Sequence, residues 1–296
     1  MRQLVVVVTC TDRKIAAAAP ELQVRSLPGG SVAQRLVVWQ ERLSRGASKV
    51  PLARLYKGEH WVQTGELMRA AASAGFAPEL WVASAGLGLQ PVSSEFPAYA
   101  ATFSPRHDDS VAASPVDRKL WWKGLQKQMS TPRVAELGAR RSVLLVLSDV
   151  YGAVLHPELH ELAQSSDDVL LVGGSEDVAG MRRLPANGAL RSALGGTMTG
   201  LNARMAASWL SQCSGGVLTS DATCRSWARW AESAANPMRY NRVPQTDAQV
   251  KDFIRRKVVE HPEHSRSRLH RMLRDSGLAC EQSRFAQLFL EVMGEK

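Results

Sequence analysis

Cysteines are few in this chain, and no two of them form a C-x-x-C pair. Such scattered cysteines are typical of reduced, mostly buried thiols and argue against a disulfide framework or a zinc site of the usual spacing. An iron–sulfur site built from all four is the weaker alternative, because cluster ligands usually stand at close local spacing. The four positions are Cys10, Cys213, Cys224 and Cys280.

Long apolar runs are also missing. No segment approaches the roughly 18 apolar residues that a membrane-spanning helix needs. The chain passes into the apolar run 4–8 without the cleavage pattern of a secretory signal. We therefore expect a cytoplasmic protein with no membrane partner.

The common catalytic and phosphate-binding motifs are absent as well. There is no P-loop, no G-x-G-x-x-G, no G-x-S-x-G nucleophile elbow and no kinase signature. His156 and His160 stand four apart in HPELH, but the H-E-x-x-H order of zinc proteases is missing, and HPEH at 261–264 is a weaker candidate still. We therefore expect no metal and no cofactor.

Acidic residues are outnumbered by basic ones. The chain carries 37 Lys and Arg against 28 Asp and Glu, which gives a net charge of +9 and an isoelectric point near 9.7. Such a surplus favours an anionic partner, of which nucleic acid is the commonest soluble kind. With 296 residues, 45% of them hydrophobic, the chain is long enough for one large α/β domain and a small appendage.

Apolar runs alternate with polar loops and helical patterns through most of the chain. The runs at 3–10, 80–85, 141–148 and 168–172 are typical of strands buried on both faces of a parallel sheet. This order predicts a mostly parallel sheet flanked by helices. The helical patterns fall at 31–45, 52–74, 117–137, 157–164 and 199–212.

A second domain is predicted for residues 244–296, after an α/β domain at 1–243. Three helical patterns follow one another at 247–260, 265–276 and 281–293, the size of a helix-turn-helix unit. Between Lys251 and Arg274 there are eight basic residues against three acidic ones. We expect this module to hold DNA, the alternative being a solvated helical face. Its expected phosphate contacts are Arg266, Arg268 and Arg271.

The candidate active site lies where the apolar runs end. Open α/β sheets bind ligands at the carboxyl ends of their strands, so polar side chains placed there face a common crevice. The stretch 81–105 is central, because it begins in the predicted strand at 80–85 and continues as a long loop stiffened by three prolines. An ordinary connection and a solvated loop are the alternatives. The ends of the runs carry Asp12, Arg13, Lys14, Ser84, Glu95, Tyr99, Phe103, Asp149 and Tyr151.

A glycine-rich turn precedes the helical pattern at 199–212. Helix N-termini with free N–H groups attract anions, so this turn is a candidate phosphate site of low specificity. Asn202 and Arg204 follow it and are assigned to the site, although a capping or surface role explains them equally well.

Carboxylates beside aromatic and basic residues suit cleavage at an anomeric carbon. One carboxylate orients water or stabilises a sugar cation, and an aromatic ring stacks on an extruded base. The expected catalytic residues are Asp12, Glu95 and Asp149. The expected base-binding residues are Ser84, Tyr99, Phe103, Tyr151 and Asn202. The expected nucleic-acid contacts of this domain are Arg13, Lys14 and Arg204.

Three segments carry a resemblance to a known family. VVVVTCTDRK, SAGLGL with PAYAATFSP, and LGGTMTGLNARMA resemble uracil-DNA-glycosylase-like proteins related to archaeosine transglycosylase and to deazapurine-in-DNA systems, over about residues 1–212. The segment DSGLACEQSRF resembles a helical DNA-binding tail. The resemblance implies a Rossmann-like three-layer α/β/α fold and excision of a modified base, as in anti-phage defence. Asp12 stands where that family has a catalytic Asp, but its H-P-S motif has no counterpart.

The sequence thus predicts a DNA glycosylase that hydrolyses the N-glycosidic bond of a modified base. A base-exchanging transglycosylase acting on DNA or RNA is the alternative enzyme. A DNA-binding regulator with a nucleotide-sensing domain is the alternative without catalysis. The target base, the choice of catalytic carboxylate and the oligomeric state are left open.

Overall fold

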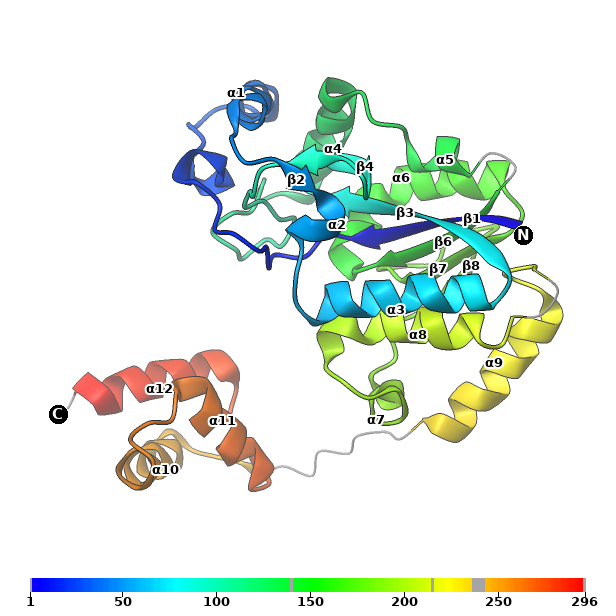
Figure 1. Cartoon of the computed structure of the whole chain (residues 1–296). Coiled ribbons are helices and arrows are strands. Elements are labelled where there is room, and N and C mark those ends of the chain that lie inside the picture. The colour runs from blue at the N-terminus through cyan, green and yellow to red at the C-terminus, as the bar shows by residue number, and fades with distance from the viewer. Residues whose placement is uncertain (1, 139–140, 214–215, 236–242, 295–296) are drawn as a thin grey trace. The chain divides into compact units, whose positions relative to one another are not determined.

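The computed structural model describes residues 2–138, 141–213, 216–235 and 243–294 (Figure 1). The chain divides into two compact units, Met1–Asn236 and Pro237–Lys296. Val243 and Pro244, the residues on either side of the predicted boundary, pair with Leu278 and Ala279. Within the described ranges no helix is long and apolar enough to cross a membrane.

A six-stranded sheet forms the centre of the first unit, with the strand order β4-β3-β1-β6-β7-β8. All neighbours are parallel except β4, which is antiparallel to β3 at one edge. This confirms the predicted α/β class with a mostly parallel sheet. The strands are β1 (Arg2–Thr9), β3 (Phe76–Ser84), β4 (Gly88–Pro91), β6 (Ser142–Leu147), β7 (Val169–Gly173) and β8 (Arg182–Leu184).

Helices cover both faces of the sheet, which gives three layers (Figure 1). On one face, α3 (Glu59–Ser73) packs against α8 (Leu201–Leu210). On the other face, α6 (Asp149–Ser165) packs against α4 (Pro115–Met129) and α5 (Val134–Leu137). The run Leu4–Val8 is therefore wholly buried, since it lies between two neighbouring strands and two helical layers.

The remaining helices and strands lie around this core. Helix α1 (Val32–Arg45) contacts α4, and its N-cap is Ser31, whose side chain accepts a hydrogen bond from the Gln34 N–H. Helix α9 (Asp221–Ala234) and strand β8 have no counterpart among the predicted elements. The short elements are β2 (Val50–Pro51), β5 (Glu95–Phe96), α2 (Leu52–Leu55), α7 (Arg191–Leu194) and single 3-10 turns at 20–22, 24–26, 188–190 and 198–200.

Two of the predicted helices are wrong because each is broken by a turn. The pattern at 52–74 splits into α2 and α3 at Gly58, whose φ of +94° no L residue adopts readily. The pattern at 117–137 splits into α4 and α5 after Ser130, which is left-handed and stands two residues before Pro132.

The predicted helix at 157–164 is too short. Helix α6 begins at Asp149, after Ser148 at the N-cap position, and continues through Pro157. Proline was expected to start this helix, but Leu155, Leu159 and Leu162 bury one continuous face, and this packing outweighs the hydrogen bond that Pro157 cannot make.

The second unit contains the three predicted helices, α10 (Asp247–Glu260), α11 (Arg266–Asp275) and α12 (Gln282–Gly294). A short parallel pair of strands, β9 (Val243–Pro244) and β10 (Leu278–Ala279), joins the start of the unit to the segment before α12. Thr246 and Ser265 cap α10 and α11 through their side-chain oxygens. The unit has its own apolar core, which includes Val250, Ile254, Leu269, Leu273 and Phe285.

Candidate functional site

A cavity of about 770 Å³ opens at the carboxyl ends of β1 and β6. After β1, the chain adds β3 and β4 on one side of β1 and then adds β6, β7 and β8 on the other side. The strand order therefore reverses between β1 and β6. Open α/β sheets bind ligands at such a reversal point. The cavity is lined by residues 9–13 after β1, by 146–148 at the end of β6, and by residues of α3, α6 and the 197–202 segment.

Two of the predicted site residues after β1 line this cavity. Asp12 and Arg13 are both exposed, and each belongs to the loop that follows Thr9. Cys10 also lines the cavity, and its sulfur lies 3.2 Å from the hydroxyl oxygen of Tyr151. The loop therefore places one carboxylate, one guanidinium and one thiol at the same opening.

Tyr151 reaches the cavity from the first turn of α6. Its hydroxyl accepts a hydrogen bond from the Ala85 N–H at 3.1 Å, and burial raises the pKa of the phenol well above its ordinary value. Asn202 lines the same cavity from α8, and its Nδ2 donates to the Leu147 carbonyl at 3.0 Å. These two predicted base-binding residues are thus brought together with Asp12.

Glu59 holds the opposite wall of the cavity in place. Its carboxylate accepts hydrogen bonds from the Thr197 N–H (2.8 Å), from the Thr197 hydroxyl (2.6 Å) and from Arg204 Nη1 (2.6 Å). The bonds from Thr197, with that from Arg204, lower the pKa of Glu59 to about 2. The residue was not predicted, although it directly follows the helix-breaking Gly58.

The glycine-rich turn therefore already binds an anion, and that anion is Glu59. Gly196 lies so close that a Cβ there would meet Glu59 Oε1 at 2.6 Å and clash with Arg204 Nη1. Arg204 is 9% exposed and is paired with Glu59, so it faces the protein and not a phosphate as predicted. The turn is a wall of the cavity, and its N–H of Thr197 is not free for a ligand.

His60 also lines the cavity, one residue after Glu59. Its Nε2 lies 2.9 Å from the Thr9 carbonyl oxygen, to which it donates. Burial lowers the pKa of the imidazole, so the ring is neutral near pH 7. The neutral ring adds no charge to the cavity.

Tyr99 and Phe103 are buried and do not face the cavity. Phe103 is 0% exposed and packs edge-on against Tyr151 at 5.0 Å between ring centroids. Tyr99 is 1% exposed, and its hydroxyl lies 2.7 Å from that of Tyr56 and 2.5 Å from Ser84 Oγ. Neither ring is available to stack on a base in this structure, because both serve the core under the loop.

Glu95 and Asp149, the two other predicted catalytic carboxylates, do not line the cavity. Glu95 is exposed in β5, where it pairs with Pro51 of β2. Asp149 is exposed in the first turn of α6, where a carboxylate is stabilised by the helix dipole. The structure thus separates Asp12 from both of its predicted partners.

Lys14 is buried, although a phosphate contact was predicted for it. It is 8% exposed, and its ammonium lies 4.3 Å from the centroid of the Tyr99 ring. The side chain borders a second, smaller cavity of about 350 Å³, which Asp12 borders as well. Asp12 is therefore the residue that the two cavities share.

A larger cavity of about 890 Å³ lies along α4 and α6, away from the strand ends. Its buried carboxylate, Glu158, already accepts hydrogen bonds from Trp122 Nε1 (2.6 Å) and from the Val134 N–H (2.9 Å). Because Glu158 already accepts these hydrogen bonds, we do not assign a catalytic site to this cavity.

The second unit presents the predicted arginines on α11. Arg266, Arg268 and Arg271 are exposed, while Leu269 and Leu273 of the same helix are buried. The helix thus carries its basic residues on the solvent side and its apolar residues in the core. Only Arg271 of the three has a carboxylate within 4 Å among the described residues, namely Asp275 at 3.8 Å.

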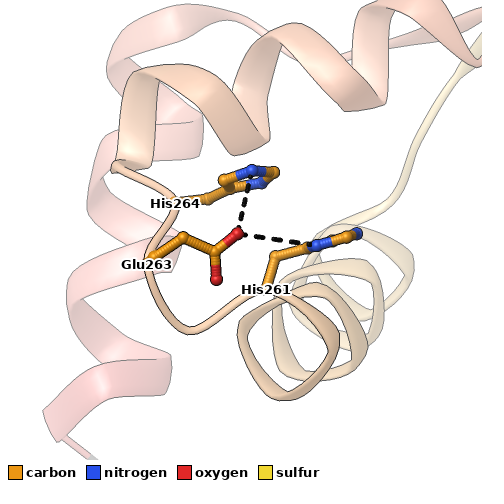
Figure 2. Close-up of side chains that lie close together, drawn as sticks. All are labelled: His261, Glu263 and His264. Carbon is orange, nitrogen blue, oxygen red and sulfur yellow. Dashed lines mark ion pairs between the residues drawn. The ribbon is translucent and has the colours of Figure 1, made fainter.

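One cluster in the described ranges has the residue types of a metal site. His261, Glu263 and His264 lie in the turn between α10 and α11, and their candidate ligand atoms are within 4.8 Å of one another (Figure 2). The two imidazole rings are stacked, with 17° between their planes. Glu263 Oε1 lies 3.2 Å from His264 Nε2 and 3.8 Å from His261 Nδ1.

Comparisons of the chain with family models, with curated proteins and with solved structures found no match.

Proposed function

We propose that the chain is a DNA N-glycosylase, which hydrolyses the bond between deoxyribose and a modified base. The observation that carries the proposal is the cavity at the β1/β6 reversal point, which is lined by Asp12, Tyr151, Asn202 and neutral His60. A volume of about 770 Å³ accommodates a nucleotide turned out of a duplex.

Asp12 is the group that acts on the sugar. When a base leaves, positive charge develops on C1′ and the ring oxygen of the deoxyribose. The Asp12 carboxylate stabilises this charge and orients the water that attacks C1′. Its exposure in the free protein allows DNA to reach it, and DNA binding removes the surrounding water and strengthens the charge interaction.

The cavity also offers groups for the departing base. Negative charge develops on the base as the bond breaks, and hydrogen-bond donors there lower the barrier. The hydroxyl groups of Thr102 and Ser104 and the Tyr151 phenol line the cavity. The raised pKa of Tyr151 keeps its hydroxyl protonated and able to donate.

The second unit supplies affinity for DNA in this proposal. The exposed arginines of α11 neutralise phosphates, and each lost phosphate contact reduces the salt dependence of binding by about one counterion. A variant with Arg266, Arg268 and Arg271 changed to Gln should bind DNA more weakly and with a shallower salt dependence. Its rate of base release from bound DNA should be unchanged.

The test uses genomic DNA from bacteria and from phages whose DNA carries modified bases. The protein is incubated with each DNA, released bases are identified by mass spectrometry, and abasic sites are scored by alkaline cleavage. A released base together with matching abasic sites supports the proposal and names the substrate. Incorporation of a labelled free base would instead establish base exchange, and DNA that is bound but unchanged would favour a regulator.

A further inference from the structure

Lys14 is a buried cation with no carboxylate partner among the described residues, whereas two other buried charged residues form ion pairs. Asp109 is paired with Arg25, and Arg204 is paired with Glu59. Lys14 Nζ donates only to backbone oxygens, those of Thr11 (3.3 Å) and Asp12 (3.4 Å). No carboxylate of the described part of the chain lies within the 4 Å of an ion pair. Burying an ammonium in this way costs free energy, so its retention calls for a use.

Burial is also what sets the protonation of this group. It lowers the pKa of the Lys14 ammonium, against the opposing effects of Cys10, Asp12 and Asp109. A lysine with a lowered pKa has more of its side chain present as the neutral amine, which is the nucleophilic form.

The position of Lys14 connects it to the candidate site. It borders the cavity of about 350 Å³, and Asp12 stands between this cavity and the larger one. A deoxyribose whose C1′ lies at Asp12 is therefore next to the cavity that Lys14 borders. The volume is enough for one sugar ring.

We propose that Lys14 is a nucleophile that forms a Schiff base with the C1′ aldehyde of an abasic deoxyribose and so cleaves the DNA strand. The inference rests on the proposed function for its substrate, since an abasic site is the product of base release. It adds a second activity, a lyase step, to the same active site.

The reaction balances without an oxidant or a reductant. The neutral Nζ attacks C1′ of the open-chain sugar, and loss of one water gives a protonated imine. A base, which we assign to Asp12, removes a proton from C2′; the C–H electrons form the C2′–C3′ double bond, and the 3′ phosphate leaves. One water then hydrolyses the imine, which releases the unsaturated aldehyde and restores Lys14.

The test begins with a duplex that already carries an abasic site, so that base release is not needed. Borohydride is added during the reaction to reduce the imine, which joins protein and DNA covalently. The wild type should give the cross-link, and peptide mapping should place it on Lys14. Lys14→Met and Lys14→Arg should give no more cross-link or strand cleavage than a reaction without protein. Lys49→Met is the control, because Lys49 is an exposed lysine that lines neither cavity, and it should react like the wild type.

Three results would overturn the inference. They are a cross-link mapped to another amine, strand cleavage that survives in Lys14→Arg, and the absence of any cross-link in the wild type. The wild-type peptide map decides the matter even if a Lys14 variant does not fold. The two proposals fail separately: base release without a cross-link removes only the lyase, and a cross-link on Lys14 without base release from any DNA removes only the glycosylase.

Discussion

Two buried basic side chains, Arg204 and Lys14, differ in whether a carboxylate pairs with them. Arg204 is paired with Glu59, and together they fix the 197–202 segment as a wall of the cavity. Lys14 has no such partner and lies against the Tyr99 ring beside open space. A buried charge with an ionic partner is part of the structure, whereas one without an ionic partner is available for chemistry.

The largest loss of stability is expected when the partner of Arg204 is removed. Glu59→Ala leaves a guanidinium that is 9% exposed without its carboxylate and leaves the Thr197 N–H unpaired. We expect the free energy of unfolding to fall by about 2–3 kcal/mol, at the lower end for broken buried pairs because Glu59 itself is partly exposed. Urea unfolding measures this loss. A change below about 0.5 kcal/mol would contradict a structural role for the pair.

The same pair predicts a dependence on acid. The pKa of Glu59 in the folded protein is about 2, below its ordinary value of 4.5. The stability that Glu59 contributes is therefore fully present above pH 4.5 and is lost as the pH falls toward 2. The free energies of unfolding of the wild type and Glu59→Gln, measured with urea, should differ at pH 6 and converge as the pH falls from 4.5 toward 2. A difference that stays constant down to pH 2 would contradict the assignment.

A smaller loss of stability is expected from substituting Gly196, which packs closely against Glu59 and Arg204. Gly196 has a φ of +68°, and a Cβ there would meet Glu59 Oε1 at 2.6 Å. Gly196→Ala should lower the free energy of unfolding by about 1–2 kcal/mol through backbone strain and crowding. Gly195→Ala is a useful control, because it has a similar φ of +71° but nothing within 4 Å of its Cβ position. The control should lose only the strain and therefore less stability than Gly196→Ala.

The smallest effect, and the one of opposite sign, is expected at Lys14. Lys14→Met shortens the side chain by one atom and removes a buried charge that has no carboxylate partner in the described part of the chain. The free energy of unfolding should rise by up to about 1 kcal/mol, because the desolvation cost disappears. Thermal unfolding checks the sign. A clear loss of stability would mean that the ammonium serves the fold, and the contrast with Arg204 would then fail.

The fold was largely predictable because the buried strands carry continuous apolar runs. The segments Leu4–Val8 and Val143–Leu147 were predicted as strands without knowledge of their neighbours. The breaks at Gly58 and Ser130 were not, since an isolated glycine or serine in a helical pattern is usually tolerated.

The site was predictable only in part, for a physical reason. Asp12, Tyr151 and Asn202 were assigned by their place at strand and helix ends, which is a matter of topology. Whether a side chain faces the cavity or the core depends on packing between distant segments. Glu59 is linked to Thr197 and Arg204 across 138 and 145 positions of sequence, and no local pattern reveals such a pairing.

The most direct test of the account compares two aspartates that both follow a strand of the sheet. Asp12 lines the cavity, and Asp149 is outside it at the start of α6. On a substrate DNA, Asp12→Asn should slow single-turnover base release by about 10²–10⁴-fold with DNA affinity unchanged, while Asp149→Asn should stay within a few-fold of the wild type. Equal losses in the two variants, or a loss at Asp12 that matches a loss of binding, would contradict the assignment of the cavity as the reaction site.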